Sequence, residues 1–408
     1  MRILTVGNMY PPHSLGGYEL VWQSWVRNAR ARGHDVRVLT SDVRIEGAGD
    51  DDGTDDVRRD LRWFWSEHQW PRWTLRERLA IERANAERFE STLAEFRPDA
   101  VMWWAMAGMS VSPIERVRRA GIPAIAVLDD YWLEYAGEVD AWQALFAGRW
   151  RRRLRRLARV LTGEIVGVDL ASEVTCIFTT DWLRIRTQEH SPQIDDFAVI
   201  PHPPPEIERF TLAPERTWGW KLVYVGRIVD VKGVDLVVEA LAELPAEATL
   251  VIDGRGDEDY ERALRGRARE LGVDDRVSFQ CSPREQLPAA YSAGDVTIFP
   301  VRWGEPFGLV PLESMAVGRP VIATGRGGSG EILRDGENCL IFDPDQGSHA
   351  LAVRIRELAD DPGLRADLRA GGRRTLDAII DERFDDAVLA VVEDRVTARS
   401  NRSAARHR

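Results

Sequence analysis

Two glutamates whose spacing suits recognition of hydroxyl groups lie in the second half of the chain. Glu305 and Glu313 are separated by seven residues. A proline and a Phe-Gly pair follow Glu305, so we expect it in a loop. The apolar pattern of residues 309–317 predicts a short buried helix, with Glu313 about one turn inside it. Each carboxylate can accept a pair of vicinal hydroxyls, and the amides at the helix start favour an anion. This layout fits a sugar nucleotide, which has a ribose diol, a diphosphate and sugar hydroxyls.

Two basic residues form a second candidate group. Arg227 and Lys232 follow Gly226 and a predicted strand over residues 221–225, and a predicted helix begins at residue 234. A diphosphate that leaves a sugar gains negative charge as the bond breaks. Fixed cations stabilise that charge more in the transition state than in the ground state. An arginine and a lysine five residues apart would be unremarkable alone. Here they stand between a strand and a helix start, in the half of the chain that also carries Glu305 and Glu313, and they resemble the diphosphate-binding pair of a known enzyme family.

The chain is similar to a known enzyme family over nearly its whole length, most strongly over residues 221–343. The matching residues are Glu305-Pro306-Phe307-Gly308, Glu313, Gly318-Arg319-Pro320-Val321 and the turn Gly327-Gly328 before Glu331. Together they resemble the signature of retaining, nucleotide-sugar-dependent glycosyltransferases of family 4, which have the GT-B fold. The resemblance implies an α/β fold of two Rossmann-like domains that face each other across a cleft. It also implies a C-terminal helix that crosses back to the first domain.

The resemblance further implies roles for individual residues. Glu305 would orient the sugar, Glu313 would bind the ribose, and the amides of residues 307–310 and of Gly17 would contact phosphates. The implied donor site comprises Gly17, Gly226, Arg227, Lys232, Glu305, Phe307, Gly308, Leu309, Val310 and Glu313. The implied catalytic residues are Glu305, Arg227, Lys232 and Asp130, and the implied acceptor site comprises Gly16, Asp129, Asp130 and Tyr131. No metal ion or other cofactor is expected, because the cations and helix ends neutralise the diphosphate.

One motif departs from the family pattern. Relatives have a sequence similar to His-Asp-Tyr-Trp at the carboxyl end of a strand in the first domain, and this chain has Asp129-Asp130-Tyr131-Trp132 there. In the family the histidine contacts the sugar near its hydroxymethyl group. An ionised carboxylate only accepts hydrogen bonds, whereas a neutral imidazole can donate or accept them. The hypothesis that follows is a donor altered at C6, such as a 6-deoxyhexose or a pentose.

The resemblance implies that the protein is a retaining glycosyltransferase. It would move a sugar from a nucleotide-diphosphate sugar to a hydroxyl of a polysaccharide, a lipid-linked glycan or a natural product. The acceptor would attack from the face on which the bond breaks and pass its proton to a departing phosphate oxygen. Two alternatives use the same donor site. One is an epimerase or hydrolase acting on the sugar nucleotide itself, which would need acid and base groups such as Asp129 and Asp130 near the sugar. The other is a catalytically silent protein that binds sugar nucleotides.

The elements that would position these residues alternate between strands and helices in both halves. Residues 2–7 read as a buried strand, the Gly16-Gly17 pair precedes a helix, and residues 35–40 form the next strand. The proline-rich segment 201–205 reads as a stiff linker. We predict an acceptor-binding domain over residues 1–204 and a nucleotide-sugar-binding domain over residues 205–376. A helix over residues 377–396 would pack on the first domain, and residues 397–408 would form a disordered tail.

Composition limits the partners. A formal net charge of −11 argues against nucleic acid, because binding a phosphate backbone needs a basic surface. The strand-like start leaves no room for a signal peptide and no apolar run is long enough to span a membrane, so we expect a cytoplasmic protein. The arginine-rich segment 149–159 fits peripheral contact with the inner face of a membrane, a solvated helix face or a patch for an anionic acceptor. The sequence does not indicate an oligomeric state.

Overall fold

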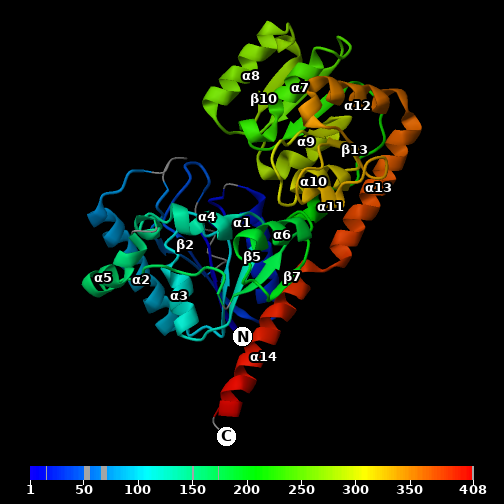
Figure 1. Cartoon of the computed structure of the whole chain (residues 1–408). Coiled ribbons are helices and arrows are strands. Elements are labelled where there is room, and N and C mark those ends of the chain that lie inside the picture. Colours follow the sequence, from blue (N-terminus) through cyan, green and yellow to red (C-terminus); the bar gives the residue numbers. More distant parts are fainter. Residues whose placement is uncertain (15, 50–55, 66–70, 149–150, 173, 407–408) are drawn as a thin grey trace. The chain divides into compact units, whose positions relative to one another are not determined.

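The computed structural model describes residues 1–14, 16–49, 56–65, 71–148, 151–172 and 174–406. The chain divides into two compact units (Figure 1). The first unit contains Met1–Pro201 and Arg383–Arg408, and the second unit contains His202–Glu382. Each unit is an α/β structure built around its own parallel sheet, as the sequence predicts.

The sheet of the first unit has seven parallel strands in the order β3-β2-β1-β4-β5-β6-β7. Their bounds are β1 Arg2–Val6, β2 Asp35–Ser41, β3 Val57–Leu61, β4 Ala100–Trp103, β5 Ala124–Leu128, β6 Thr175–Phe178 and β7 Phe197–Val199. The strand order reverses between β1 and β4, because the chain first builds the sheet towards β3 and then returns to the other side of β1. β4 and β5 are buried at every position, as expected for strands covered by helices on both faces.

The helices of the first unit cover both faces of this sheet. Their bounds are α1 Gly17–Ala31, α2 Leu75–Phe96, α3 Ser112–Arg119, α4 Trp132–Val139, α5 Arg155–Thr162, α6 Asp181–His190 and α14 Phe384–Arg406. In α1 the buried residues recur at intervals of three and four, which directs one apolar stripe against the sheet. The ring of Trp22 in this stripe stacks on Trp104, with 5.9 Å between ring centroids.

The sheet of the second unit has six strands in the order β10-β9-β8-β11-β12-β13, and the strands pair in parallel. Their bounds are β8 Lys221–Val225, β9 Thr249–Asp253, β10 Val277–Gln280, β11 Val296–Phe299, β12 Val321–Ala323 and β13 Leu340–Ile341. The longer helices are α7 Val234–Leu241, α8 Glu258–Glu270, α9 Leu287–Ala293, α10 Leu309–Ala316, α12 Ser348–Asp360 and α13 Pro362–Asp381, and α11 is the single turn Ser329–Ile332. Here the strand order reverses between β8 and β11.

The C-terminal region confirms one prediction and corrects two others. As expected, the last helix packs on the first unit, where Phe384, Val388 and Val392 lie in the same buried cluster as Trp25. The predicted helix start at residue 377 is wrong, because α13 continues to Asp381 and the chain turns at Arg383, whose φ is 51°. The predicted disordered tail is also wrong over residues 397–406, which continue α14. A docked helix needs no new nucleus to extend through residues with good helix propensity, such as alanine and arginine.

Candidate active site

Several of the candidate donor residues lie in the loops that follow the two strands at the reversal point of the second sheet. β8 runs into Gly226, Arg227 and the 3-10 turn Asp230–Lys232, and β11 runs into the loop that carries Glu305. In open α/β sheets, ligands bind outside the carboxyl ends of strands where the strand order reverses. The sheet topology therefore brings together two loops that are more than sixty residues apart in the sequence.

The backbone of Glu305 is fixed by the glycine-rich turn after β12. Glu305 and Gly327 form a parallel bridge, in which the Glu305 amide donates to the Arg326 carbonyl at 3.1 Å and the Ser329 amide donates to the Glu305 carbonyl at 3.3 Å. Gly327 has a φ of 78°, and a Cβ placed there would lie 2.5 Å from the Glu305 nitrogen. Since no larger residue fits without a backbone shift, this glycine serves the close approach of two protein segments.

The side chain of Glu305 binds two donors through one oxygen. Its Oε2 atom lies 2.6 Å from Nζ of Lys232 and accepts a hydrogen bond of 2.7 Å from Nε1 of Trp303. The Lys232 ammonium also lies 5.3 Å from the centre of the Trp303 ring, within range of a cation–π contact. The Oε1 atom of Glu305 has no partner among the described residues. The Lys232 and Glu305 side chains are only 13% and 15% exposed, so this charge-assisted cluster is largely shielded from water.

Arg227 has a different environment from Lys232. Its side chain is exposed and makes no hydrogen bond or ion pair with another described residue. Its backbone is held, because the Tyr224 hydroxyl donates to the Arg227 carbonyl at 2.6 Å. Burial raises the pKa of Tyr224 far above its usual value, which keeps this hydroxyl protonated as a donor. The loop therefore presents a guanidinium on a fixed backbone with its donors available to a ligand.

The start of α10 supplies backbone donors beside this cluster. The sequence predicts a helix over residues 309–317, and the structure has α10 over Leu309–Ala316, preceded by Gly308 with a φ of 119°. The first amides of a helix, here those of Leu309 and Val310, have no acceptor within it and favour an anion. Phe307 is buried and its ring lies 4.8 Å from that of His202. His202 is thus part of the packing under this loop.

Glu313 has a buried environment that the sequence does not predict. Its side chain is only 4% exposed and forms an ion pair with Nη1 of Arg284, and its Oε2 atom accepts a hydrogen bond of 2.7 Å from the Tyr291 hydroxyl. Arg284 also donates to the Pro205 carbonyl at 2.8 Å and lies 5.0 Å from the centre of the Phe210 ring. Burial, followed by the Glu313 charge, raises the pKa of Tyr291 well above its usual value. Glu313 is thus held by two protein partners rather than exposed at the helix surface.

The predicted acceptor residues of the first unit meet at the carboxyl ends of β1 and β5. Gly16 directly precedes α1, and its amide donates to Oε2 of Glu19 at 3.0 Å. The Tyr18 hydroxyl donates to the Val127 carbonyl at the end of β5. The pKa of Tyr18 is raised well above its usual value, mainly by burial and further by the charges of Asp130 and Asp129. The start of α1 and the loop after β5 are therefore neighbours.

The Asp129-Asp130-Tyr131 segment follows β5 and is half-buried. Oδ1 of Asp130 accepts a hydrogen bond of 2.9 Å from the Trp132 amide, so this carboxylate holds the start of α4. The guanidinium of Arg186 lies 4.6 Å from the centre of the Tyr131 ring. Trp303, Arg284, Tyr291 and Arg186 are all absent from the sequence prediction. Their contacts depend on tertiary packing, and no local pattern marks them.

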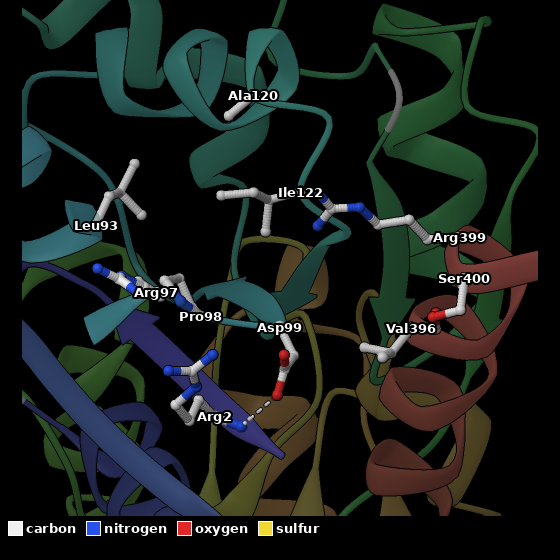
Figure 2. Close-up of a pocket in the computed structure, with 10 residues that line it drawn as sticks. All are labelled: Arg2, Leu93, Arg97, Pro98, Asp99, Ala120, Ile122, Val396, Arg399 and Ser400. Atoms are coloured by element: carbon white, nitrogen blue, oxygen red, sulfur yellow. Dashed lines mark hydrogen bonds between the residues drawn. The ribbon is translucent and has the colours of Figure 1, made fainter. Parts of the chain in front are cut away.

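The part of the chain that the structure describes has three further properties. No group of three or more potential metal ligands occurs among them. The described helices also include none with the length and hydropathy needed to cross a bilayer. An open pocket of about 770 Å³ in the first unit is lined by Arg2, Asp99, Arg399 and their neighbours (Figure 2). Because Arg2 begins β1 and Asp99 precedes β4, this pocket lies at the amino ends of the strands, away from the predicted site residues.

Two family models match the sequence. The model for glycosyl transferases group 1 matches residues 213–375, and the model for a glycosyl transferase 4-like domain matches residues 16–163. A D-inositol 3-phosphate glycosyltransferase of Acidothermus cellulolyticus is 36% identical over 203 residues, which cover 46% of this chain and 45% of that protein. An alpha-D-kanosaminyltransferase of Streptomyces kanamyceticus is 32% identical over 150 residues, which cover 35% of this chain and 37% of that protein. The chain thus matches less than half the length of these curated relatives.

Solved structures share the fold over almost the whole chain. The sucrose-phosphate synthase of Thermosynechococcus elongatus has a TM-score of 0.75 at 19% identity, and the comparison covers 97% of this chain and 99% of that chain. The HepE protein of Anabaena in complex with UDP and glucose has a TM-score of 0.69 at 17% identity, covering 96% of this chain and 99% of that one. At such identities the likeness concerns the fold alone.

Proposed function

Since the chain belongs to the group 1 glycosyltransferases of family 4, we propose that it transfers a sugar from a nucleotide-diphosphate sugar to an acceptor hydroxyl and retains the anomeric configuration. The observation that carries this proposal is the cluster of Lys232, Trp303 and Glu305 at the reversal point of the second sheet, beside the exposed Arg227. It combines two cations for a diphosphate with a carboxylate that keeps one oxygen for a sugar hydroxyl.

The reaction follows from the charges at this cluster. The bond between the anomeric carbon and the phosphate oxygen breaks, and negative charge grows on the departing diphosphate. Arg227 and Lys232 stabilise that charge, together with the amides at the start of α10. The acceptor oxygen bonds to the anomeric carbon from the same face, and its proton passes to an oxygen of the departing diphosphate. No protein base and no metal ion is part of this scheme.

The two glutamates have distinct roles in the proposal. Oε1 of Glu305 accepts hydrogen bonds from the sugar, while the bonds of Oε2 to Lys232 and Trp303 hold the carboxylate in place. Glu313 binds the ribose diol with the lone pairs that its bonds to Arg284 and Tyr291 leave available. Arg284 and Tyr291 therefore fix the orientation of the Glu313 carboxylate before the ligand binds.

The first unit supplies the acceptor side in this proposal. Gly16 and Gly17 at the start of α1, together with the loop Asp129-Asp130-Tyr131, form that surface. The carboxylate of Asp129 is the reason to propose a donor altered at C6, because an ionised carboxylate accepts hydrogen bonds and cannot donate them, unlike the histidine of the family pattern. The names of the relatives suggest compounds to include in a first screen, namely D-inositol 3-phosphate as an acceptor and a nucleotide-activated kanosamine as a donor.

A two-stage experiment tests the proposal. The full chain is first heated with a panel of nucleotide sugars that includes UDP-glucose, its 6-deoxy counterparts and UDP-pentoses. A ligand at 100 times its dissociation constant should stabilise the fold by about 2.7 kcal/mol. The donor that binds is then incubated with acceptor hydroxyls, and NMR of the product should show the anomeric configuration of the donor. Epimerised or hydrolysed donor without acceptor would favour a sugar-nucleotide epimerase or hydrolase, and binding without turnover would favour a silent binding protein. A preference for unmodified hexoses would end the C6 hypothesis.

A further inference from the structure

Helix α5 (Arg155–Thr162) has an arrangement opposite to that of an ordinary surface helix. None of its residues is buried. Four large apolar side chains in and just before it are strongly exposed: Leu154 at 51%, Leu157 at 54%, Val160 at 75% and Leu161 at 73%. Leu154, Leu157 and Leu161 are three or four residues apart and so share one side of a helix. We call these four residues the α5 apolar face.

The opposite side of α5 is attached to the protein by arginines. Arg155 donates to the Phe146 carbonyl at 3.1 Å, and Arg159 donates to the Val166 carbonyl at 3.2 Å. Ala158, between them, packs in a small cluster around Phe64 and Trp142. Helices of soluble domains normally direct leucines inward and arginines outward. In α5 the guanidiniums of Arg155 and Arg159 bond to the protein and the leucines face outward, so solvation of a polar face does not account for this helix.

Further cations lie beside the α5 apolar face. Arg151 and Arg153 in the preceding 3-10 turn Arg151–Leu154, and Arg156 in α5, are exposed. They form a local positive patch on a chain whose formal net charge is −11. An exposed apolar face flanked by cations is complementary to the acyl region and the anionic headgroups of a bilayer surface. Residues 149–150 lie outside the described part of the chain and do not enter this inference.

We propose that the α5 apolar face and Arg151, Arg153 and Arg156 dock this protein on an anionic lipid bilayer. The leucines and Val160 enter the boundary between headgroups and acyl chains, and the arginines contact lipid phosphates. A second copy of the chain fits this surface less well, because a two-fold interface would bring the same arginines of both copies together. Figure 1 shows α5 at the periphery of the first unit beside α2, where Arg83 of α2 donates to the Thr162 carbonyl. The inference does not depend on the proposed sugar transfer.

Vesicle binding of the full chain tests this directly. The probes are vesicles of phosphatidylcholine alone and of phosphatidylcholine mixed with phosphatidylglycerol, separated from free protein by sedimentation. The wild-type chain should bind the mixed vesicles far better, and added salt should weaken the binding. The variant L157Q/V160Q/L161Q should lower the partition coefficient at least tenfold. The variant R151Q/R153Q/R156Q should lower the partition coefficient about fivefold for each positive charge removed, and only for the vesicles that contain phosphatidylglycerol.

Control variants keep the test interpretable. Ile185 is 50% exposed on α6 of the same unit, and I185Q should leave the partition coefficient unchanged. Because all the substituted side chains are exposed, thermal unfolding of each variant should match the wild-type protein. The inference is overturned if the wild-type chain binds neither kind of vesicle, or if L157Q/V160Q/L161Q binds the mixed vesicles to the same extent as the wild-type chain. A wild-type dimer that L157Q/V160Q/L161Q converts to a monomer would assign the face to a second copy instead.

Discussion

Glu82 in α2 makes the stability of the first unit depend on pH. Its side chain is fully buried, and neither carboxyl oxygen has a hydrogen-bond partner among the described residues. Burial, followed by the charge of Asp140, raises the pKa of Glu82 from 4.5 to about 8, and burial also raises the pKa of Asp140. Between pH 4.5 and about pH 8, the folded chain keeps a proton on Glu82 that the unfolded chain releases. Stability therefore falls as pH rises through this window, by up to about 1.4 kcal/mol for each pH unit.

The variant E82Q removes this ionisation and keeps the shape of the side chain. At about pH 5 the glutamate is already neutral in the fold, so wild type and variant should be similarly stable. Near pH 8 the variant should be more stable by a few kcal/mol, since the wild-type fold has to keep the carboxyl protonated or bury its charge. Glu82 and Asp140 titrate as a coupled pair, in two steps. Because the pKa of Asp140 is raised as well, the free energy of unfolding keeps some dependence on pH at lower pH in both the wild-type protein and E82Q.

Urea unfolding at a series of pH values measures the effect. Tryptophan fluorescence reports mainly on the first unit, which contains most of the tryptophans of the chain. Glu87 on the same helix is exposed, and E87Q is the matched control that should not change the pH slope. An E82Q slope equal to that of the wild-type protein between about pH 5 and 8 would refute the reasoning.

Three other substitutions test the candidate site. W303F removes the indole donor to Glu305 but keeps the ring, and kcat/KM for sugar transfer should fall about tenfold or more, because a hydrogen bond to a charged group is worth about 1.5–3 kcal/mol. G327A places a methyl group against the backbone of Glu305, so thermal unfolding should show destabilisation and turnover should be largely lost. R284M leaves the Glu313 charge buried without its cation, and chemical unfolding should show a loss towards the low end of about 3–5 kcal/mol, since Arg284 is partly exposed.

Two matched controls separate these effects from general damage. Trp218 has an indole nitrogen with no hydrogen-bond partner among the described residues, so W218F should retain wild-type kcat/KM. Gly336 has a φ of 74°, close to that of Gly327, but open space around the added Cβ. G336A should therefore carry the cost of the backbone conformation alone and leave turnover intact. Equal losses in G327A and G336A would contradict the role assigned to the contact with Glu305.

The fold and the loops of the candidate site are accessible from the sequence because they depend on local patterns. Alternation of buried strands and amphipathic helices predicts the two α/β units. The glycines and prolines around Glu305 predict a loop, and the start of α10 falls at the predicted residue. Lys232 and Glu305 are identified separately as candidates. That they form an ion pair follows only from the sheet order, which places β8 beside β11.

The remaining features depend on packing between distant segments. The bonds of Glu313 to Arg284 and Tyr291 join residues with no fixed spacing in sequence, and the glycine turn at Gly327 reads equally well as a ligand loop. The extension of α14 to Arg406 depends on docking of its first half against the first unit, so composition alone wrongly suggests disorder. The outward direction of the α5 leucines is likewise set by bonds of Arg155 and Arg159 to carbonyls elsewhere in the chain.

A crystal structure of the chain with a bound nucleotide sugar tests the central claim most directly. We predict that the diphosphate lies within hydrogen-bond distance of the Arg227 guanidinium and Nζ of Lys232, with a sugar hydroxyl on Oε1 of Glu305. A sugar nucleotide bound away from these three side chains would contradict the proposed site.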